Sequence, residues 1–356
     1  MFSEIAVVYP RGLRTGGPEA LHQLVDSLRR RGQEAYLVPS DDTVGPDRVA
    51  EYAVYDAPER PTLPRGHDSA VVVAETAPAP DRGDAVVFRW WLSIDNHSAE
   101  NGHIRRLEYG LGMRGEWQEM PRHHRVGTAF KQALRNFSAP PELPPEIDLA
   151  QSQYAWAHLF GRTRRPPSML GDYTPSPDAL IAAAVPVARR RRAVCFNPKK
   201  SGSLAREVSA GFPDVEFVPI ENMSRAEVTR SLGECAVYLD LGSHPGKDRI
   251  PREAVLAGAV VVTAMRGSAA FHVDVPIPLH HKVPSDGDVV ASARAVLSDV
   301  FADLPSAYAL QDSYRDVISG EREVFDAQVQ AVFTRGMRGF DPSYPIVADM
   351  ARFADE

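Results

Sequence analysis

Cations, a carboxylate and glycines gather in one short stretch, YLDLGSHPGKDRIPREAVLAGAVVVT, which spans residues 238–263. An apolar run ends at Asp240, a loop carries Lys247 and Arg249, and a proline then begins a pattern typical of a short helix. The apolar run 259–262 predicts the next strand. The loop of such a parallel α/β unit lies at the carboxyl edge of the sheet, where open sheets bind ligands. Two glycines, two cations and a helix N-terminus at this edge suit a phosphate or diphosphate.

Polar side chains follow three predicted strands in the second half of the chain. The three loops, at 197–202, 220–224 and 242–253, would open onto one cleft, because the carboxyl ends of parallel strands meet at one edge. Lysine and arginine match the charge of a diphosphate, and a carboxylate one turn into a helix can accept hydrogen bonds from ribose hydroxyls. The candidate binding residues are Asn197, Lys199, Lys200, Glu221, Asn222, Met223, Ser243, His244, Gly246, Lys247, Asp248, Arg249 and Glu253.

Each of these candidates also has a structural interpretation. Glu253 follows a helix N-terminus closely, so it could simply complement the helix dipole. One of the adjacent lysines, Lys199 or Lys200, is expected to be merely exposed. For Arg252, which is not among the candidates, the ligand and structural interpretations carry equal weight.

The chain begins with a similar unit. The pattern predicts a strand over 5–9, a turn at Thr15-Gly16-Gly17-Pro18 that starts a helix, and a strand over 35–38. A dinucleotide site would require G-x-G-x-x-G and an acidic residue at the end of the second strand. The chain has only Gly16-Gly17, and that strand ends in Val-Pro-Ser, so the pattern does not favour NAD or FAD. The two glycines would instead let a substrate approach the backbone.

Two carboxylates of the first half stand where a general base could act. Glu75 and Asp95 come just after predicted strands at 69–74 and 85–91, and His97 could pair with Asp95. A base for an acceptor hydroxyl needs such a position at the edge of the cleft. A strand-end cap or polar contact is a slightly better-supported interpretation for each carboxylate. The three residues are the catalytic candidates.

The alternation of strands and helices restarts after the arginine run 189–192, which predicts two α/β domains with parallel sheets. We expect an N-terminal domain over 1–185, a C-terminal domain over 186–325, and a segment over 326–356 that packs back on the N-terminal domain. Further strands are predicted at 147–152, 193–196, 215–219, 235–239 and 277–279, and helices at 154–160, 179–184, 203–210, 287–301 and roughly 305–333.

Composition sets broader limits. The 356 residues are 44% hydrophobic and 24% charged, which is enough apolar material for two cores, and the net charge of −7 does not suggest a nucleic-acid partner. No stretch resembles a signal peptide or a membrane span, so we expect a cytoplasmic protein, with peripheral membrane contact through basic patches left open. Cys195 and Cys235 are expected to be buried thiols, and the adjacent histidines in 121–125 lack metal-ligand spacing.

Several segments together resemble the GT-B glycosyltransferases. They are TGGPEAL (15–21), FNPKKSG (196–202) and HPGKDRIPREAVLAGAVVVT (244–263). With RWWLSIDN (89–96) and DLAQSQYA (148–155), the set is similar to bacterial glycosyltransferase-like proteins linked to polysaccharide biosynthesis. The resemblance implies two Rossmann-like domains that face each other across a cleft, with a sugar-nucleotide donor in the C-terminal one.

The resemblance also implies an activity. The protein would transfer a sugar from a nucleotide-diphosphate sugar to a hydroxyl of a glycan or another acceptor, with the donor as substrate and no cofactor. Lys199 or Lys200 would hold the diphosphate with Lys247 and Arg249, and Glu253 would hold the ribose. No D-x-D motif stands at a predicted strand end, which is consistent with metal-independent chemistry.

The chain departs from the best-known retaining branch of that family. That branch has two glutamates spaced E-x7-E; Glu253 fits the second, but Pro245 stands in place of the first. The anomeric outcome is therefore not assigned, nor are the donor nucleotide, the sugar, the acceptor or the oligomeric state. Two alternatives stay open: a sugar-nucleotide epimerase on the same fold, and a non-catalytic protein that binds a sugar nucleotide or glycan.

Overall fold

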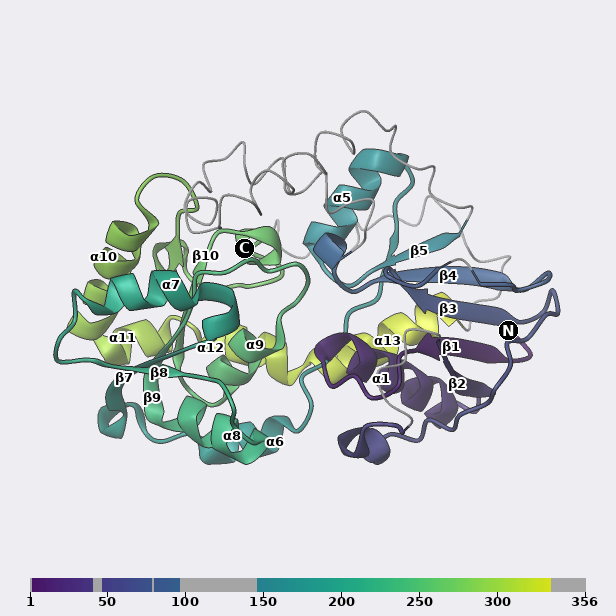
Figure 1. Cartoon of the computed structure of the whole chain (residues 1–356), viewed down its shortest axis with the longest axis horizontal. Coiled ribbons are helices and arrows are strands. Elements are labelled where there is room, and N and C mark those ends of the chain that lie inside the picture. The colour runs from purple at the N-terminus through teal and green to yellow at the C-terminus, as the bar shows by residue number, and fades with distance from the viewer. Residues whose placement is uncertain (1, 41–46, 79, 97–145, 334–356) are drawn as a thin grey trace, which may run out of the picture.

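Two parallel sheets, one in each half of the chain, organise the computed structural model (Figure 1). The structure describes residues 2–40, 47–78, 80–96 and 146–333. His97, the histidines in 121–125 and the segment 334–356 lie outside the described residues. The predicted class, an α/β protein with two parallel-sheet domains, is confirmed.

The N-terminal sheet has the strand order β2-β1-β3-β4-β5-β6. Its strands are β1 (Ile5–Tyr9), β2 (Ala35–Pro39), β3 (Ala70–Ala74), β4 (Val86–Trp91), β5 (Ile147–Ala150) and β6 (Ser168–Met169). The first five match the predicted strands. The short β6 was not predicted, because it lies in a stretch rich in proline and arginine and gains its hydrogen bonds only by pairing with β5.

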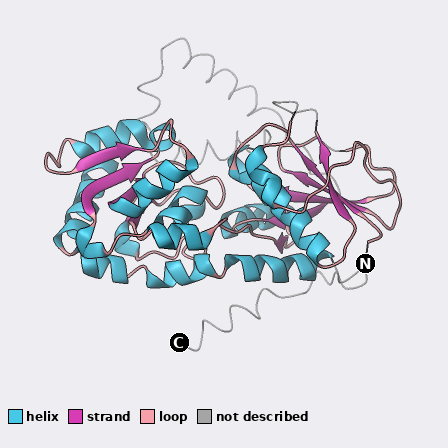
Figure 2. Ribbon diagram, turned by 90° about the horizontal axis from the view of Figure 1, so that it is seen from below, coloured by secondary structure: helices cyan, strands magenta, loops and turns pink. Residues whose placement is uncertain are grey.

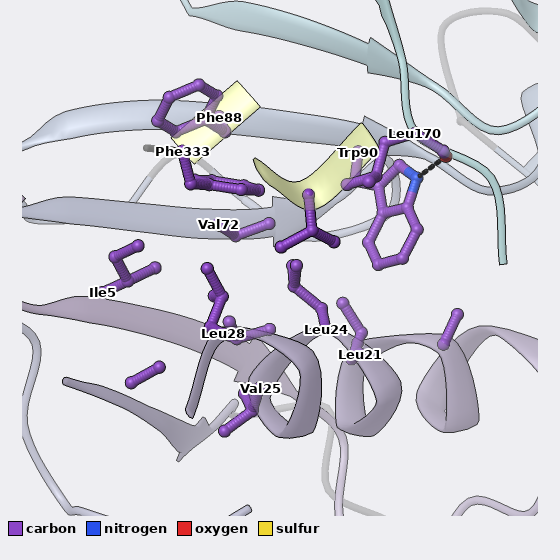
Figure 3. Packing of buried hydrophobic residues seen from close by; sticks show 14 of the residues in the cluster. Ile5, Leu21, Leu24, Val25, Leu28, Val72, Phe88, Trp90, Leu170 and Phe333 are labelled. Carbon is purple, nitrogen blue, oxygen red and sulfur yellow. Dashed lines mark hydrogen bonds between the residues drawn. The ribbon is translucent and has the colours of Figure 1, made fainter. Parts of the chain in front are cut away.

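Helices cover this sheet and line its edge. They are α1 (Gly16–Arg30), α5 (Gln153–Thr163), α13 (Glu321–Phe333) and the 3-10 turns η1 (Ala50–Val54) and η2 (Ile94–Asn96). The apolar face of α1, including Leu21, Leu24 and Leu28, packs on the sheet in the core shown in Figure 3. Trp90 lies in the same core, and its ring N–H donates to the carbonyl oxygen of Leu170 at 2.7 Å.

The C-terminal sheet has the order β11-β10-β9-β7-β8. Its strands are β7 (Arg191–Phe196), β8 (Glu216–Pro219), β9 (Cys235–Asp240), β10 (Val260–Ala264) and β11 (Lys282–Val283). The predicted strand at 277–279 is wrong: Ile277 is buried, but the prolines on either side of it cannot donate to a ladder, and pairing begins only at Lys282. Cys195 and Cys235 are buried free thiols, as predicted.

The helices of this half position the candidate site. They are α6 (Pro177–Ala183), α7 (Pro198–Ser209), α8 (Arg225–Glu234), α9 (Arg249–Leu256), α10 (Val289–Ala302), α11 (Leu304–Ala309) and α12 (Asp312–Ser319), with 3-10 turns η3 (Val187–Arg189), η4 (Gly267–Ala270) and η5 (Leu279–His281). The predicted loop at 197–202 is wrong, because Asn197 caps a helix that starts at Pro198. The region 305–333, which was predicted to be helical, contains three helices: α11, α12 and α13 (Glu321–Phe333).

Helix α13 connects the two halves. Figure 2 shows a row of helices that runs along one side of the molecule and ends against the N-terminal sheet. Phe325, Val329 and Phe333 lie in the N-terminal core, and the Asp326 carboxylate pairs with Arg30 of α1 at 3.1 Å. The described part of the predicted return segment therefore packs on the N-terminal domain. Among the helices that the structure describes, none combines the length and apolar composition of a membrane span.

Candidate functional site between the two sheets

The segment 242–253, predicted as a loop, is a loop up to Asp248 and then the first turn of α9, and it lies directly against the N-terminal domain. The backbone N–H of Ile94 donates to the carbonyl oxygen of Pro245 at 3.1 Å. A Cβ at Gly246 would collide with the carbonyl oxygen of Leu92, so only glycine allows this approach. Loops at the carboxyl edges of the two sheets therefore contact each other, and the predicted binding loop is part of this domain contact.

Arg252 is the centre of a buried ion cluster that joins the domains. Its guanidinium lies 2.7 Å from the Asp172 carboxylate and 3.0 Å from that of Glu321, and Lys247 Nζ lies 3.0 Å from Glu321. Burial raises the pKa of Asp172, but the adjacent Arg252 outweighs it and holds that pKa below its usual value. The Gln151 side chain completes the cluster, because it donates to Asp172 and accepts the backbone N–H of Lys247. These ion pairs favour the structural interpretation of Arg252.

Arg249, one helical turn earlier, makes a different cross-domain contact. Its Nη2 lies 2.6 Å from a carboxylate oxygen of Glu19, in the first turn of α1. The Tyr55 hydroxyl donates to the other oxygen of Glu19 at 2.8 Å. A Cβ at Gly16 would lie 3.8 Å from the same guanidinium nitrogen, so the predicted glycine turn does face the predicted phosphate-binding arginine.

A second polar cluster joins the loop itself to Lys200 of α7 and Asp240 of β9. Lys200 donates to the Asp248 carboxylate and, at 3.2 Å, to the carbonyl oxygen of Ser243. His244 is fully buried, with Nδ1 2.9 Å from Asp248 and Nε2 3.7 Å from Asp240. Burial raises the pKa of Asp248, but His244 and Lys200 bring it down to about 2.

This second cluster bears on cation binding. Asp240, His244 and Asp248 offer three ligand atoms that all lie within 4.8 Å of one another, which could hold a metal ion. In the structure, the Lys200 ammonium already lies on Asp248 and supplies a positive charge. The burial of His244 makes it a support for the loop, with no exposed atom for a substrate to reach.

Asp95 is the predicted base that reaches the domain contact. One carboxylate oxygen accepts from the Ser243 hydroxyl of the binding loop, and the other accepts from the Tyr154 hydroxyl of α5, both at 3.1 Å. Burial raises the pKa of Asp95 above its usual value. His158, one turn after Tyr154 on α5, feels the charge of Asp95, although burial lowers the pKa of this histidine.

Glu75 is placed differently. Its side chain is buried and accepts the backbone N–H of Leu92 at 3.0 Å, beneath the segment that touches the binding loop. Burial raises the pKa of Glu75 to about 7. The geometry suits support of the 92–94 segment, whereas Asp95 lies at the domain contact, where it accepts from Ser243.

Glu253 lies one helical turn after Arg249 on the same face of α9, and the start of α8 contacts it. Glu253 is buried, its carboxylate lies 3.5 Å from Arg225, and burial raises its pKa. Glu221 and Asn222 are exposed, and Met223 is half-buried. The contact with Arg225 brings the start of α8 next to Glu253.

Two candidates lie at the start of α7. The Asn197 side chain accepts the backbone N–H of Lys199 at 3.0 Å and so acts as a helix cap. Lys199 is exposed, whereas Lys200 turns into the cluster with Asp248. The expectation that one of the two lysines is merely exposed fits this arrangement.

Sequence reasoning missed several residues of the domain contact. Gln151 and Tyr154 lie in the segment DLAQSQYA, whose resemblance was noted without a role for either residue. Asp172, Glu321 and Arg225 lie in no motif, and only the fold brings them to the loop.

Comparison with known proteins places the chain among structures of one fold. No protein-family model matches the sequence, and no curated protein matches it. Among solved structures, WaaG, a glycosyltransferase involved in lipopolysaccharide biosynthesis, is 14% identical, with a TM-score of 0.54 over 93% of this chain and 100% of its own. HepE of Anabaena in complex with UDP-glucose is 12% identical, with a TM-score of 0.54 over 92% and 98%. Sucrose-phosphate synthase of Thermosynechococcus elongatus is 11% identical, with a TM-score of 0.54 over 99% and 100%. The chain has the GT-B fold that these glycosyltransferases share.

Proposed function

We propose that the protein is a glycosyltransferase that moves a sugar from a nucleotide-diphosphate sugar to a hydroxyl of a glycan or another acceptor. The observation that carries the proposal is the meeting of the cationic loop 242–253 with the Asp95 carboxylate across a GT-B domain contact. A role in bacterial polysaccharide biosynthesis is part of the proposal, supported by the resemblance of the sequence motifs.

The donor would bind at α9. Arg249 and Lys247 would take the diphosphate, together with the N-terminus of this helix, because guanidinium, ammonium and backbone N–H groups all favour phosphate oxygens. Glu253 would accept hydrogen bonds from the ribose. Arg225 at the start of α8 supports this assignment, because it holds Glu253 beside the exposed loop that would meet the base.

Asp95 would act as the general base. The acceptor O–H would give its proton to the Asp95 carboxylate as the acceptor oxygen forms a bond to the anomeric carbon. The bond from that carbon to the β-phosphate oxygen would break, and its electron pair would leave with the nucleoside diphosphate. A raised pKa makes Asp95 a better proton acceptor than an ordinary aspartate.

The donor half of the proposal is tested by binding. A thermal-shift panel of UDP, GDP and dTDP should show one nucleotide that raises the melting temperature, because a ligand of the native state stabilises it. Arg249→Ala and Glu253→Ala should each weaken that binding about tenfold or more. Arg192→Ala is the matched control, because this exposed arginine pairs with Asp214 away from the loop. Unchanged affinity in both site variants would remove the site assignment.

The catalytic half is tested by turnover. Asp95→Asn should lower the rate of nucleotide release about a hundredfold or more without changing nucleotide affinity, because it removes the base and keeps the shape. Asp81→Asn, an exposed acid of the same domain, should leave the rate unchanged. Turnover of the donor that needs no acceptor, with inversion at a sugar carbon, would indicate an epimerase instead. A full rate in Asp95→Asn would exclude this residue as the base.

Metal independence is also a proposal. Lys247, Arg249 and the α9 N-terminus would neutralise the leaving diphosphate, so activity should survive dialysis against EDTA. Loss of activity that Mn²⁺ restores would contradict this, and Asp240, His244 and Asp248 would then be the first ligands to test.

A further inference from the structure

The cations around the start of α9 are each paired with a carboxylate. The same is true of Lys200 in α7, which contacts the loop before α9. The pairs are Lys200 with Asp248, Lys247 with Glu321, Arg249 with Glu19, and Arg252 with Asp172 and Glu321. A diphosphate and a carboxylate bind the same guanidinium or ammonium donors. A donor that uses one of these cations must therefore replace a carboxylate that already occupies it.

The pair formed by Arg249 and Glu19 is the one suited to exchange. Within the described part of the chain, Arg249 forms an ion pair with a single carboxylate, and its side chain is 19% exposed. Arg252 is 2% exposed, pairs with two carboxylates and also donates to the carbonyl oxygens of Asp248 and Lys247. Displacing one partner of a partly exposed arginine leaves far less buried charge than opening the Arg252 cluster.

Glu19 has other stabilising partners once Arg249 leaves. The Tyr55 hydroxyl already donates to it at 2.8 Å. Glu19 also lies in the first turn of α1, where the helix dipole stabilises a negative charge. The carboxylate can therefore lose its arginine without being left unpaired in the contact.

We propose that Glu19 is the resident counter-ion of Arg249, and that the diphosphate of the donor displaces it. This inference rests on the proposed donor site. In the absence of a donor, the pair holds α1 against α9 across the domain contact; donor binding exchanges it for an arginine–phosphate contact. Glu19 thus lowers the affinity for the donor, and Tyr55 limits that loss by holding the released carboxylate.

Isothermal titration of the full chain with UDP, and separately with inorganic pyrophosphate, tests this exchange. Glu19→Gln should bind both about tenfold more tightly than the wild type, because the carboxylate that pairs directly with Arg249 is gone. Tyr55→Phe should bind them about threefold more weakly, because the displaced Glu19 loses a hydrogen bond. A purely structural role for the two residues would weaken binding in both variants, so opposite signs distinguish the models.

Glu51→Gln is the matched control. Glu51 is an acid of the same domain that pairs with Arg14 at 2.9 Å, and both of these side chains are about half exposed. Its neutralisation should leave UDP affinity within about twofold of the wild type, because an exposed pair is screened by solvent. A similar gain in this variant would assign the effect to overall charge and overturn the role of Glu19.

The outcomes separate the two proposals. If the wild type binds UDP or pyrophosphate but Glu19→Gln binds it equally or more weakly, the counter-ion role is wrong and the donor site stands. If neither protein binds a nucleotide or pyrophosphate, while circular dichroism shows both to be folded, the donor site fails and the counter-ion role fails with it.

Discussion

Arg249 and Arg252 lie one turn apart on α9, and both form ion pairs with acids of the N-terminal domain. Their surroundings differ, and so do the roles that we assign to them. Arg252 is sealed between Asp172 and Glu321, and Arg249 meets Glu19 at a partly exposed edge. The residue type and the helix are the same. What differs is the number of partners and the access of water, and these decide whether an arginine supports a structure or can accept a ligand.

Two buried carboxylates of the N-terminal domain show the same contrast. Asp172 faces Arg252, which keeps its pKa low, whereas burial raises the pKa of Glu75 to about 7 and outweighs its backbone hydrogen bonds and the charge of Arg89. A buried acid that forms an ion pair thus stays charged, whereas Glu75, where burial outweighs the charge of Arg89, takes up a proton near neutral pH.

The largest effect on stability is expected for Arg252→Ala, which tests whether Arg252 is more important for stability than Arg249. The variant leaves two buried carboxylates without their main partner, so the free energy of unfolding should fall by about 3–5 kcal/mol. Urea unfolding followed by circular dichroism measures the change. A loss below about 1 kcal/mol would mean that Arg252 is no more structural than Arg249.

The carboxylate comparison is tested first by Glu75→Gln. Because the folded-state pKa of Glu75 is raised from 4.5 to about 7, its stabilising contribution is complete below pH 4.5 and is lost as the pH rises through 7. The free energy of unfolding of the wild type should fall relative to that of the variant by about 3 kcal/mol between pH 4.5 and 8. Urea unfolding of both proteins across this range provides the measurement, and parallel pH curves would contradict the protonated state.

Asp172→Asn should show the opposite dependence on pH. The folded-state pKa of Asp172 lies below 3.8, so its contribution is present above that value and is lost as the pH falls through the lower folded-state pKa. At pH 7 the variant should lose about 2 kcal/mol of unfolding free energy, as expected for a charged hydrogen bond. Melting curves at pH 7, 5 and 3 should converge with those of the wild type at the acid end; a constant difference would argue against an ionised Asp172.

The smallest effect on stability is expected for Arg249→Ala. Removal of a partly exposed pair, with Glu19 still held by Tyr55, should cost about 1 kcal/mol or less. The same urea titration as for Arg252→Ala makes the comparison direct. A loss of 3 kcal/mol or more would place Arg249 in the structural group and weaken its assignment to the donor.

Much of the fold could be read from local patterns. The apolar runs predicted β1 to β5 and β7 to β10 to within about two residues. The failures have local causes: prolines flank buried Ile277, and Asn197 followed by proline starts a helix where a loop was expected. A pattern of apolar residues reports burial, and it cannot by itself report which backbone groups are paired.

The amino-acid sequence by itself determined the two α/β units and the presence of Lys247, Arg249 and Glu253 after a strand end, because strand order within βα units follows from local chain geometry. It could not determine the partner of each charge. Asp172 stands 80 residues before Arg252 and belongs to no motif. Only the packing of one domain on the other brings such groups within 3 Å and sets how much water reaches them, and this decided that Arg252 supports the contact while Arg249 lies at its edge.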